Sequence, residues 1–172
     1  MTVTDLNSPV HLAGKRSREA AVAHDKDAWL ANFADDAVVE DPIGPSHFDP
    51  EGKGHRGKDA IAKFYDMAIA PSTLTFHFEK TYQCGDEEAN VGHIVIESSG
   101  YRVVAEGVFT YRVDAEGKIV ALRAYWELDR AAASAQKIYA ACAAVSVYAA
   151  GHSAGAVGAN EQAAHIAASM VG

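Results

Sequence analysis

One carboxylate at the end of a short apolar segment is the residue of this sequence best suited to chemistry. The segment 37–41 reads as a strand, and because side chains alternate along a strand, Val39 and Asp41 point one way and Glu40 the other. Pro42 cannot donate to a sheet ladder, so the strand should end with Asp41 at its rim. Burial raises the basicity of a carboxylate, so Asp41 is a candidate catalytic base. The local pattern also fits an ordinary turn aspartate.

The run from Phe33 to Gly44 resembles the ketosteroid isomerase family of the nuclear transport factor 2-like (SnoaL-like) superfold. Asp41 falls on the position of the family's base. The resemblance continues through 57–65 and 117–126, and it can be followed over residues 8–130. It implies a steroid delta-isomerase-like activity by intramolecular proton transfer, without a cofactor, in a homodimer.

The oxygen-binding groups of that family are incompletely matched. In the family, a tyrosine and a protonated aspartic acid hold the oxygen of the intermediate while the base moves the proton. Counting along the resemblance, Ser17 occupies the tyrosine position and Phe109 the acid position. Both expected donors are therefore replaced.

Two tyrosines are candidates for the missing donor. Tyr65 matches a family tyrosine that supports the replaced one, and Tyr111 lies two residues from Phe109, on the same strand face. Ser17 could instead hold a water molecule at this position. Both tyrosines are explained equally well as aromatic core residues.

An apolar pocket should surround the acid. Strand parity, helix face and the resemblance place five residues in it: Phe64, Ile94, Ile96, Phe109 and Trp126. An apolar pocket with one acid suits a steroid-like, terpenoid-like or polyketide-like ligand. Each of these residues, taken singly, is also explained as ordinary core.

The order of the predicted elements indicates an α+β fold. Ser8 and Asp25 are N-cap signals for helices over 9–23 and from 26 to Phe33, before an Asp35-Asp36 turn. A third helix is predicted around 58–68, and four strands follow, over 73–82, 89–98, 101–113 and 118–128. The resemblance implies a cone-shaped, curved antiparallel sheet wrapped around the N-terminal helices.

Composition divides the chain and limits its partners. The 172 residues are 49% hydrophobic, which predicts one α+β domain over 1–130, and an Ala-rich helical extension over 131–172, with helices near 138–148 and 161–170. A net charge of −8 argues against a nucleic-acid or anionic-membrane partner. Without a secretory or membrane-spanning segment, a soluble cytoplasmic protein is expected.

The sequence also contains possible metal ligands. His47, Asp49, Glu51 and His55 lie close together in a segment rich in glycine and proline. Their spacing matches no metal-binding motif, so a solvated loop is the better interpretation, and no metal site is predicted.

The preferred hypothesis is a small-molecule isomerase that moves a proton on a ketosteroid or another apolar enone. Asp41 is the base, and Tyr65 or Tyr111 is the oxygen donor. Three alternatives remain: a non-catalytic carrier of an apolar ligand, a cyclase, dehydratase or epoxide hydrolase on the same fold, and a scaffold for oligomerisation.

Overall fold

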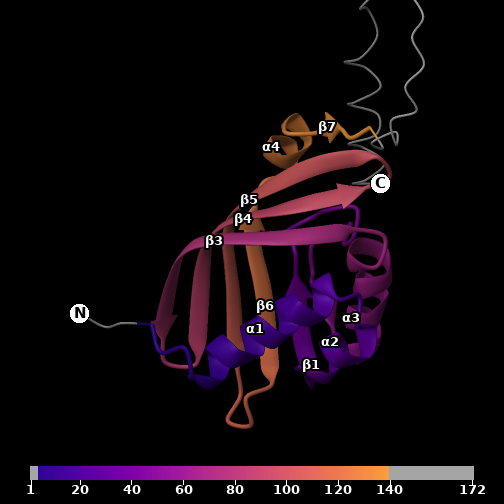
Figure 1. Ribbon diagram of the computed structural model, residues 1–172. Coiled ribbons are helices and arrows are strands. Elements are labelled where there is room, and N and C mark those ends of the chain that lie inside the picture. Colours follow the sequence, from indigo (N-terminus) through magenta and orange to yellow (C-terminus); the bar gives the residue numbers. More distant parts are fainter. Residues whose placement is uncertain (1–3, 140–172) are drawn as a thin grey trace, which may run out of the picture.

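The computed structural model describes residues 4–139. The chain begins with helices and continues as a meander of long strands (Figure 1). Its elements, in order, are α1 (Pro9–Val22), α2 (Lys26–Ala31), β1 (Phe33–Glu40), β2 (His55–Arg56), α3 (Lys58–Phe64), the π-helical turn η1 (Tyr65–Ile69), β3 (Thr73–Cys84), β4 (Glu87–Ser98), β5 (Tyr101–Val113), β6 (Ile119–Trp126), α4 (Leu128–Ala133) and β7 (Gln136–Lys137).

The predicted helix starts are confirmed. The Ser8 side chain accepts a hydrogen bond from the His11 backbone amide at 3.3 Å, and Pro9 is the first residue of α1. Asp25 caps α2 in the same way, accepting from the Ala28 amide at 2.9 Å. These bonds satisfy amide groups that have no partner inside a helix.

The predicted end of the second helix is wrong. Helix α2 ends at Ala31, and Phe33 opens β1 opposite Ile119 of β6. Asp35 and Asp36 therefore lie on a strand, with their side chains exposed, and do not form a turn. Phe33 is completely buried. Pairing with β6 places its ring in the core, and this burial outweighs the local preference for a further turn of helix.

The sheet follows the order β2-β1-β6-β5-β4-β3, with β7 added beside β5. Strands β3 to β6 form the predicted antiparallel hairpins, whereas β1 joins β6 in parallel. The helices α1, α2 and α3 lie on one side of this curved sheet (Figure 1). This arrangement confirms the predicted α+β class.

Two glycines explain how the long strands can bend. Gly92 of β4 and Gly107 of β5 are paired directly across the ladder. A Cβ atom at Gly92 would overlap the His77 carbonyl oxygen, and one at Gly107 would overlap the Tyr125 carbonyl oxygen. Only glycine permits such a close approach between backbones, and the bend creates the concave face on which the helices pack.

The core under the helices is built around Trp29. Its ring lies 4.6 Å from the Phe33 ring and 5.3 Å from the Tyr65 ring, measured between centroids. All three side chains are buried, and they join α2, β1 and the start of η1 into one apolar cluster. This cluster anchors the start of β1, the strand that leads to Asp41.

Beyond β6 the chain returns to the sheet. Helix α4 packs near β5. Strand β7 pairs with β5, with Tyr101 opposite Lys137. The predicted division at residue 130 stays a prediction, and the helices predicted within 138–148 and 161–170 lie almost entirely outside the described residues. Within residues 4–139, no helix is long and apolar enough to cross a membrane.

Candidate active site

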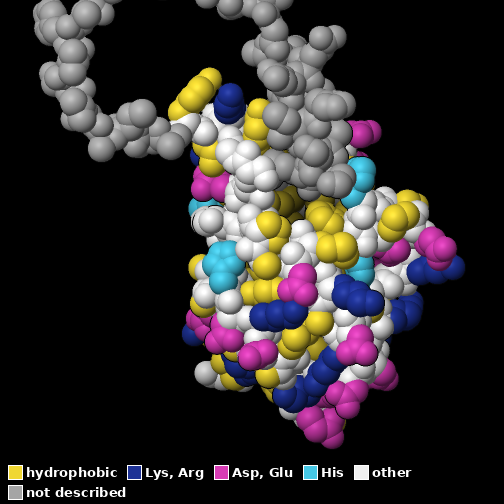
Figure 2. Space-filling view, turned by 90° about the vertical axis from the view of Figure 1, so that its right-hand side faces the viewer, with side chains coloured by type: hydrophobic (Ala, Val, Ile, Leu, Met, Phe, Trp, Pro, Cys, Tyr) yellow, Lys and Arg dark blue, Asp and Glu magenta, His cyan; other side chains and the backbone are white. Residues whose placement is uncertain are grey.

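A cavity of about 440 Å³ lies among the concave face of the sheet and the helices. The structure places all five predicted pocket residues at its wall, together with further apolar side chains from β3. Figure 2 shows hydrophobic side chains gathered around a hollow on one face of the molecule. The cavity is within the size range of small-molecule sites, and its wall comprises Phe64, Phe76, Phe78, Ile94, Ile96, Phe109 and Trp126 among others.

Asp41 faces this cavity from the end of β1. It follows the last strand residue, Glu40, and the backbone is tied back to β6 by a bond of 3.0 Å from the Ile43 amide to the Ala124 carbonyl. The Trp126 indole donates a hydrogen bond of 2.6 Å to Asp41 Oδ1. Within residues 4–139, this indole is the only hydrogen-bond donor to the carboxylate.

The surroundings of Asp41 make it a stronger base than an ordinary aspartate. Burial raises the pKa of Asp41 from its usual 3.8 to about 6, and the hydrogen bond from Trp126 opposes part of this rise. At neutral pH the group is still mainly ionised, but it holds a proton more readily than an exposed carboxylate does. A general base needs this combination.

Tyr111 and Ser17 lie at the same cavity wall. Burial raises the pKa of the Tyr111 hydroxyl, interactions with Arg18 and Ser17 lower it, and the charge of Asp41 raises it. The phenol therefore remains protonated at neutral pH and can donate a hydrogen bond into the cavity. Ser17 is 2% exposed and lines the cavity, so it is shielded from bulk solvent.

Tyr65 is not among the residues that line the cavity. Its ring packs on Trp29, and its buried hydroxyl has no hydrogen-bond partner among residues 4–139. Burial raises the pKa of Tyr65, and the carboxylates of Asp25 and Asp66 act in the same direction. Of the two tyrosines considered as donors, only Tyr111 is at the wall.

Sequence reasoning missed Arg18, which also lines the cavity. Its guanidinium carbon lies 5.3 Å from the centre of the Phe78 ring and 5.8 Å from that of Tyr111. Gly14, one helical turn earlier, leaves room for this side chain, since a Cβ there would lie 3.1 Å from Arg18 Nη1. A glycine four residues before an arginine within α1 is the signal that could have located it.

The loop between β1 and β2, together with His55 at the start of β2, holds the possible metal ligands. Asp49 accepts a hydrogen bond of 2.6 Å from the Gly54 amide, and the His55 ring packs on Phe64. His47 borders the cavity, and burial lowers its pKa and that of His55. In the described part of the chain, no group of three or more His, Cys, Asp or Glu could hold a metal ion.

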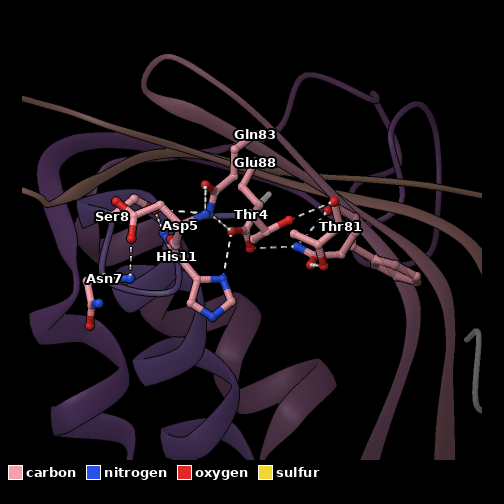
Figure 3. Close-up of polar contacts among 10 residues, drawn as sticks. Thr4, Asp5, Asn7, Ser8, His11, Thr81, Gln83 and Glu88 are labelled. Carbon is pink, nitrogen blue, oxygen red and sulfur yellow. Dashed lines mark hydrogen bonds and ion pairs between the residues drawn. The ribbon is translucent and has the colours of Figure 1, made fainter. Parts of the chain in front are cut away.

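Figure 3 shows a polar cluster centred on Glu88. Glu88 and its partners are not among the residues that line the cavity. Glu88 is 1% exposed, and its carboxylate receives bonds from Gln83 at 2.9 Å and Asn90 at 3.1 Å, with His11 Nδ1 at 2.8 Å. Burial acts to raise the pKa of Glu88, but these bonds outweigh it and hold the pKa below its usual value. Since Gln83 also accepts from the Asp5 amide at 2.9 Å, the cluster fastens the N-terminal segment to β3 and β4.

Comparisons with known proteins show which proteins this chain resembles in sequence and fold. The family model described as a SnoaL-like domain matches residues 15–122. A steroid Delta-isomerase from Nocardioides simplex is 26% identical over 121 residues, which are 70% of this chain and 92% of that protein.

Two solved structures are more similar. The Delta 5-3-ketosteroid isomerase from Mycobacterium sp. is 41% identical with a TM-score of 0.66, over 75% of this chain and 98% of that one. RV0760c from Mycobacterium tuberculosis, in complex with estradiol-17beta-hemisuccinate, is 42% identical with a TM-score of 0.69, over 72% of this chain and 98% of that one.

Proposed function

This chain belongs to the SnoaL-like domain family and is ketosteroid isomerase-like, and we propose that it is a small-molecule isomerase acting on a ketosteroid or a similar apolar enone. The observation that carries the proposal is Asp41, an aspartate with a pKa of about 6 that faces an apolar cavity of about 440 Å³. The named activity of the ketosteroid isomerase relative supports the same reaction class.

In the proposed reaction, Asp41 takes a proton from the carbon between the carbonyl group and the isolated double bond. The electron pair of the broken C–H bond forms a carbon–carbon double bond to the carbonyl carbon, and a carbonyl pair moves onto oxygen. Asp41 then returns the proton to the far end of the original double bond, and the carbonyl group reforms. Only a proton is moved, and Asp41 carries it, so the proposed steps need no cofactor.

The intermediate carries its negative charge on oxygen, which needs a hydrogen-bond donor. Tyr111 is the proposed donor, because the residue lines the cavity and its raised pKa keeps the phenol protonated. Ser17 is a second candidate, directly or through a water molecule. Loss of one such donor commonly costs about 3 kcal/mol of transition-state stabilisation, so the replacement of two needs compensation.

The test is conversion of a β,γ-unsaturated 3-ketosteroid to its conjugated isomer, followed by ultraviolet absorbance. Asp41→Asn keeps the shape of the side chain and removes the base, so we expect kcat to fall by roughly 10²–10⁴-fold while steroid affinity is kept. Glu40→Gln is the matched control, because Glu40 binds Arg123 at 2.6 Å and does not line the cavity. Unchanged turnover in Asp41→Asn would refute the role of Asp41.

A non-catalytic binder is the second candidate function. Phe109 and Ser17 favour it, because both stand where the family carries an oxygen donor. Wild-type protein that binds the steroid without converting it would establish this alternative. The same measurement therefore separates the two functions.

A further inference from the structure

Arg18 is a positive charge at the wall of an otherwise largely apolar cavity. Its Nη1 atom is buried and has no hydrogen-bond partner within residues 4–139, and the guanidinium forms no ion pair with them. Arg18 as a whole is partly buried, but its Nη1 atom has lost its contact with water without gaining a partner, which is costly. Contact with the aromatic faces of Phe78 and Tyr111 recovers only part of that loss.

Arg18 acts on one oxygen in particular, the hydroxyl of Tyr111. Interactions with Arg18 and with Ser17 both act on the Tyr111 hydroxyl, and all three residues line the cavity. Asp41 also influences Tyr111, but it lies at the end of β1 and is bonded to Trp126. The wall thus carries a base beside Trp126 and a cationic, hydrogen-bonding group around Tyr111.

We propose that Arg18 supplies the positive charge that stabilises the ligand's oxygen atom when this oxygen becomes anionic, while Tyr111 donates the hydrogen bond to it. Arg18 is a positioning residue, acting through Tyr111 and through its field, since its Nη1 atom is covered. This inference rests on the proposed function, in which proton removal by Asp41 leaves a negative charge on the ligand oxygen. It explains how the cavity compensates for Ser17 and Phe109.

The arrangement also predicts which ligands the cavity prefers. A field from a cation in an apolar surrounding is screened much less than in water, so it favours an anionic oxygen over a neutral group of the same size. The site should therefore select ligands whose buried end carries an enolisable ketone or a phenol. An unsubstituted hydrocarbon end should bind more weakly.

The experiment compares estradiol with 3-deoxyestradiol, which differ only in the phenolic oxygen, by calorimetric titration of wild type, Arg18→Met and Arg18→Lys. Met keeps an unbranched side chain against Phe78 and Tyr111 and removes the charge. We expect wild type to prefer estradiol by roughly ten- to hundredfold, and Arg18→Met to lose most of this preference with little change in 3-deoxyestradiol affinity. Arg18→Lys should keep most of it.

A spectroscopic readout separates an electrostatic role from a structural one. The absorbance of bound estradiol reports ionisation of its phenol, and the pKa of that phenol should be higher on Arg18→Met than on wild type, because the stabilising charge is gone. Lys15→Met is the control, since it removes an exposed charge from the same helix. If circular dichroism shows that Arg18→Met does not fold, Arg18→Gln takes its place.

The outcomes distinguish this inference from the proposed function. An unchanged preference and phenol pKa in the Arg18 variant overturn the role of Arg18 and leave Asp41 as the base. Binding of neither steroid by wild type overturns both the steroid class and the inference. If wild type prefers estradiol through Arg18 but never isomerises an enone, the role of the Arg18 charge is supported and the proposed isomerase activity is refuted.

Discussion

Two neighbouring acids, Glu40 and Asp41, show how strongly burial and partners decide the chemistry of a carboxylate. Glu40 pairs with Arg123 at 2.6 Å, whereas Asp41 faces the cavity and receives one indole hydrogen bond. A cationic partner would have favoured the charged form of Asp41, and burial disfavours it. The basicity of Asp41 therefore comes from its surroundings.

We expect kcat/KM for isomerisation to rise about tenfold per pH unit below pH 6, and to level off above it, since only ionised Asp41 accepts a proton. The pH at which the profile levels off follows from the Asp41 pKa of about 6. Trp126→Phe removes the bond that lowers this pKa, so its rising limb should move to higher pH. Initial rates between pH 4.5 and 8 measure both profiles, and a wild-type profile without this limb would contradict the assignment of Asp41.

At the scale of elements, the hairpin of β3 and β4 does two different things. Near the middle of β4, the pairing of Gly92 with Gly107 of β5 lets the sheet bend around the cavity. Near its turn, the Glu88 cluster fastens the N-terminal segment, including the residues that lead into α1. Since Ser17 and Arg18 are on α1, this attachment helps fix the helix that carries them.

Glu88→Gln should lower the free energy of unfolding at pH 7 by roughly 1–3 kcal/mol, because an amide cannot accept all the bonds that the carboxylate accepts. The pKa of Glu88 is held below 4.5 in the folded protein, so its stabilisation is present above that pH and is lost as pH falls through the folded value. Urea unfolding at pH 7 and pH 3.5 measures the difference.

Glu87→Gln is the control for this prediction, because Glu87 is the exposed neighbour on the same strand. The two variants should differ clearly at pH 7 and much less at pH 3.5. Equal stability of both variants at pH 7 would show that the buried cluster contributes nothing to folding.

At the scale of the molecule, the sheet continues past the predicted domain boundary. Ser134 of the segment after α4 accepts a hydrogen bond of 2.8 Å from the Val104 amide, and the Ile138 amide donates to the Gly100 carbonyl at 2.8 Å. Ala131 also lines the cavity. Residues 131–139 thus contact β5, and Ala131 among them also borders the site.

Deletion of residues 131–172 should therefore lower the thermal midpoint several degrees more than deletion of 140–172. The reason is that the contacts of residues 131–139 contribute about 1–2 kcal/mol to the free energy of unfolding. Differential scanning calorimetry of the two truncations isolates the contribution of 131–139. Equal midpoints would contradict it. Light scattering on the full chain measures the native mass, for which we expect that of a homodimer.

Local patterns in the sequence determined the order of most elements, the caps of the first two helices and the exit of Asp41 at the end of β1. Cap residues, strand alternation and proline act over a few neighbouring residues, so they can be read without a structure. The boundary between α2 and β1 was predicted wrongly, because burial of Phe33 opposite Ile119 outweighed local helical spacing.

Only the tertiary structure decided the surroundings of the site. The donor to Asp41 lies 85 residues away in the chain, and Arg18 meets Phe78 and Tyr111 only because the sheet bends over α1. The same packing put Tyr111 at the cavity wall and turned Tyr65 towards Trp29. Such contacts depend on how segments far apart in the chain pack together, and local sequence patterns do not specify that packing.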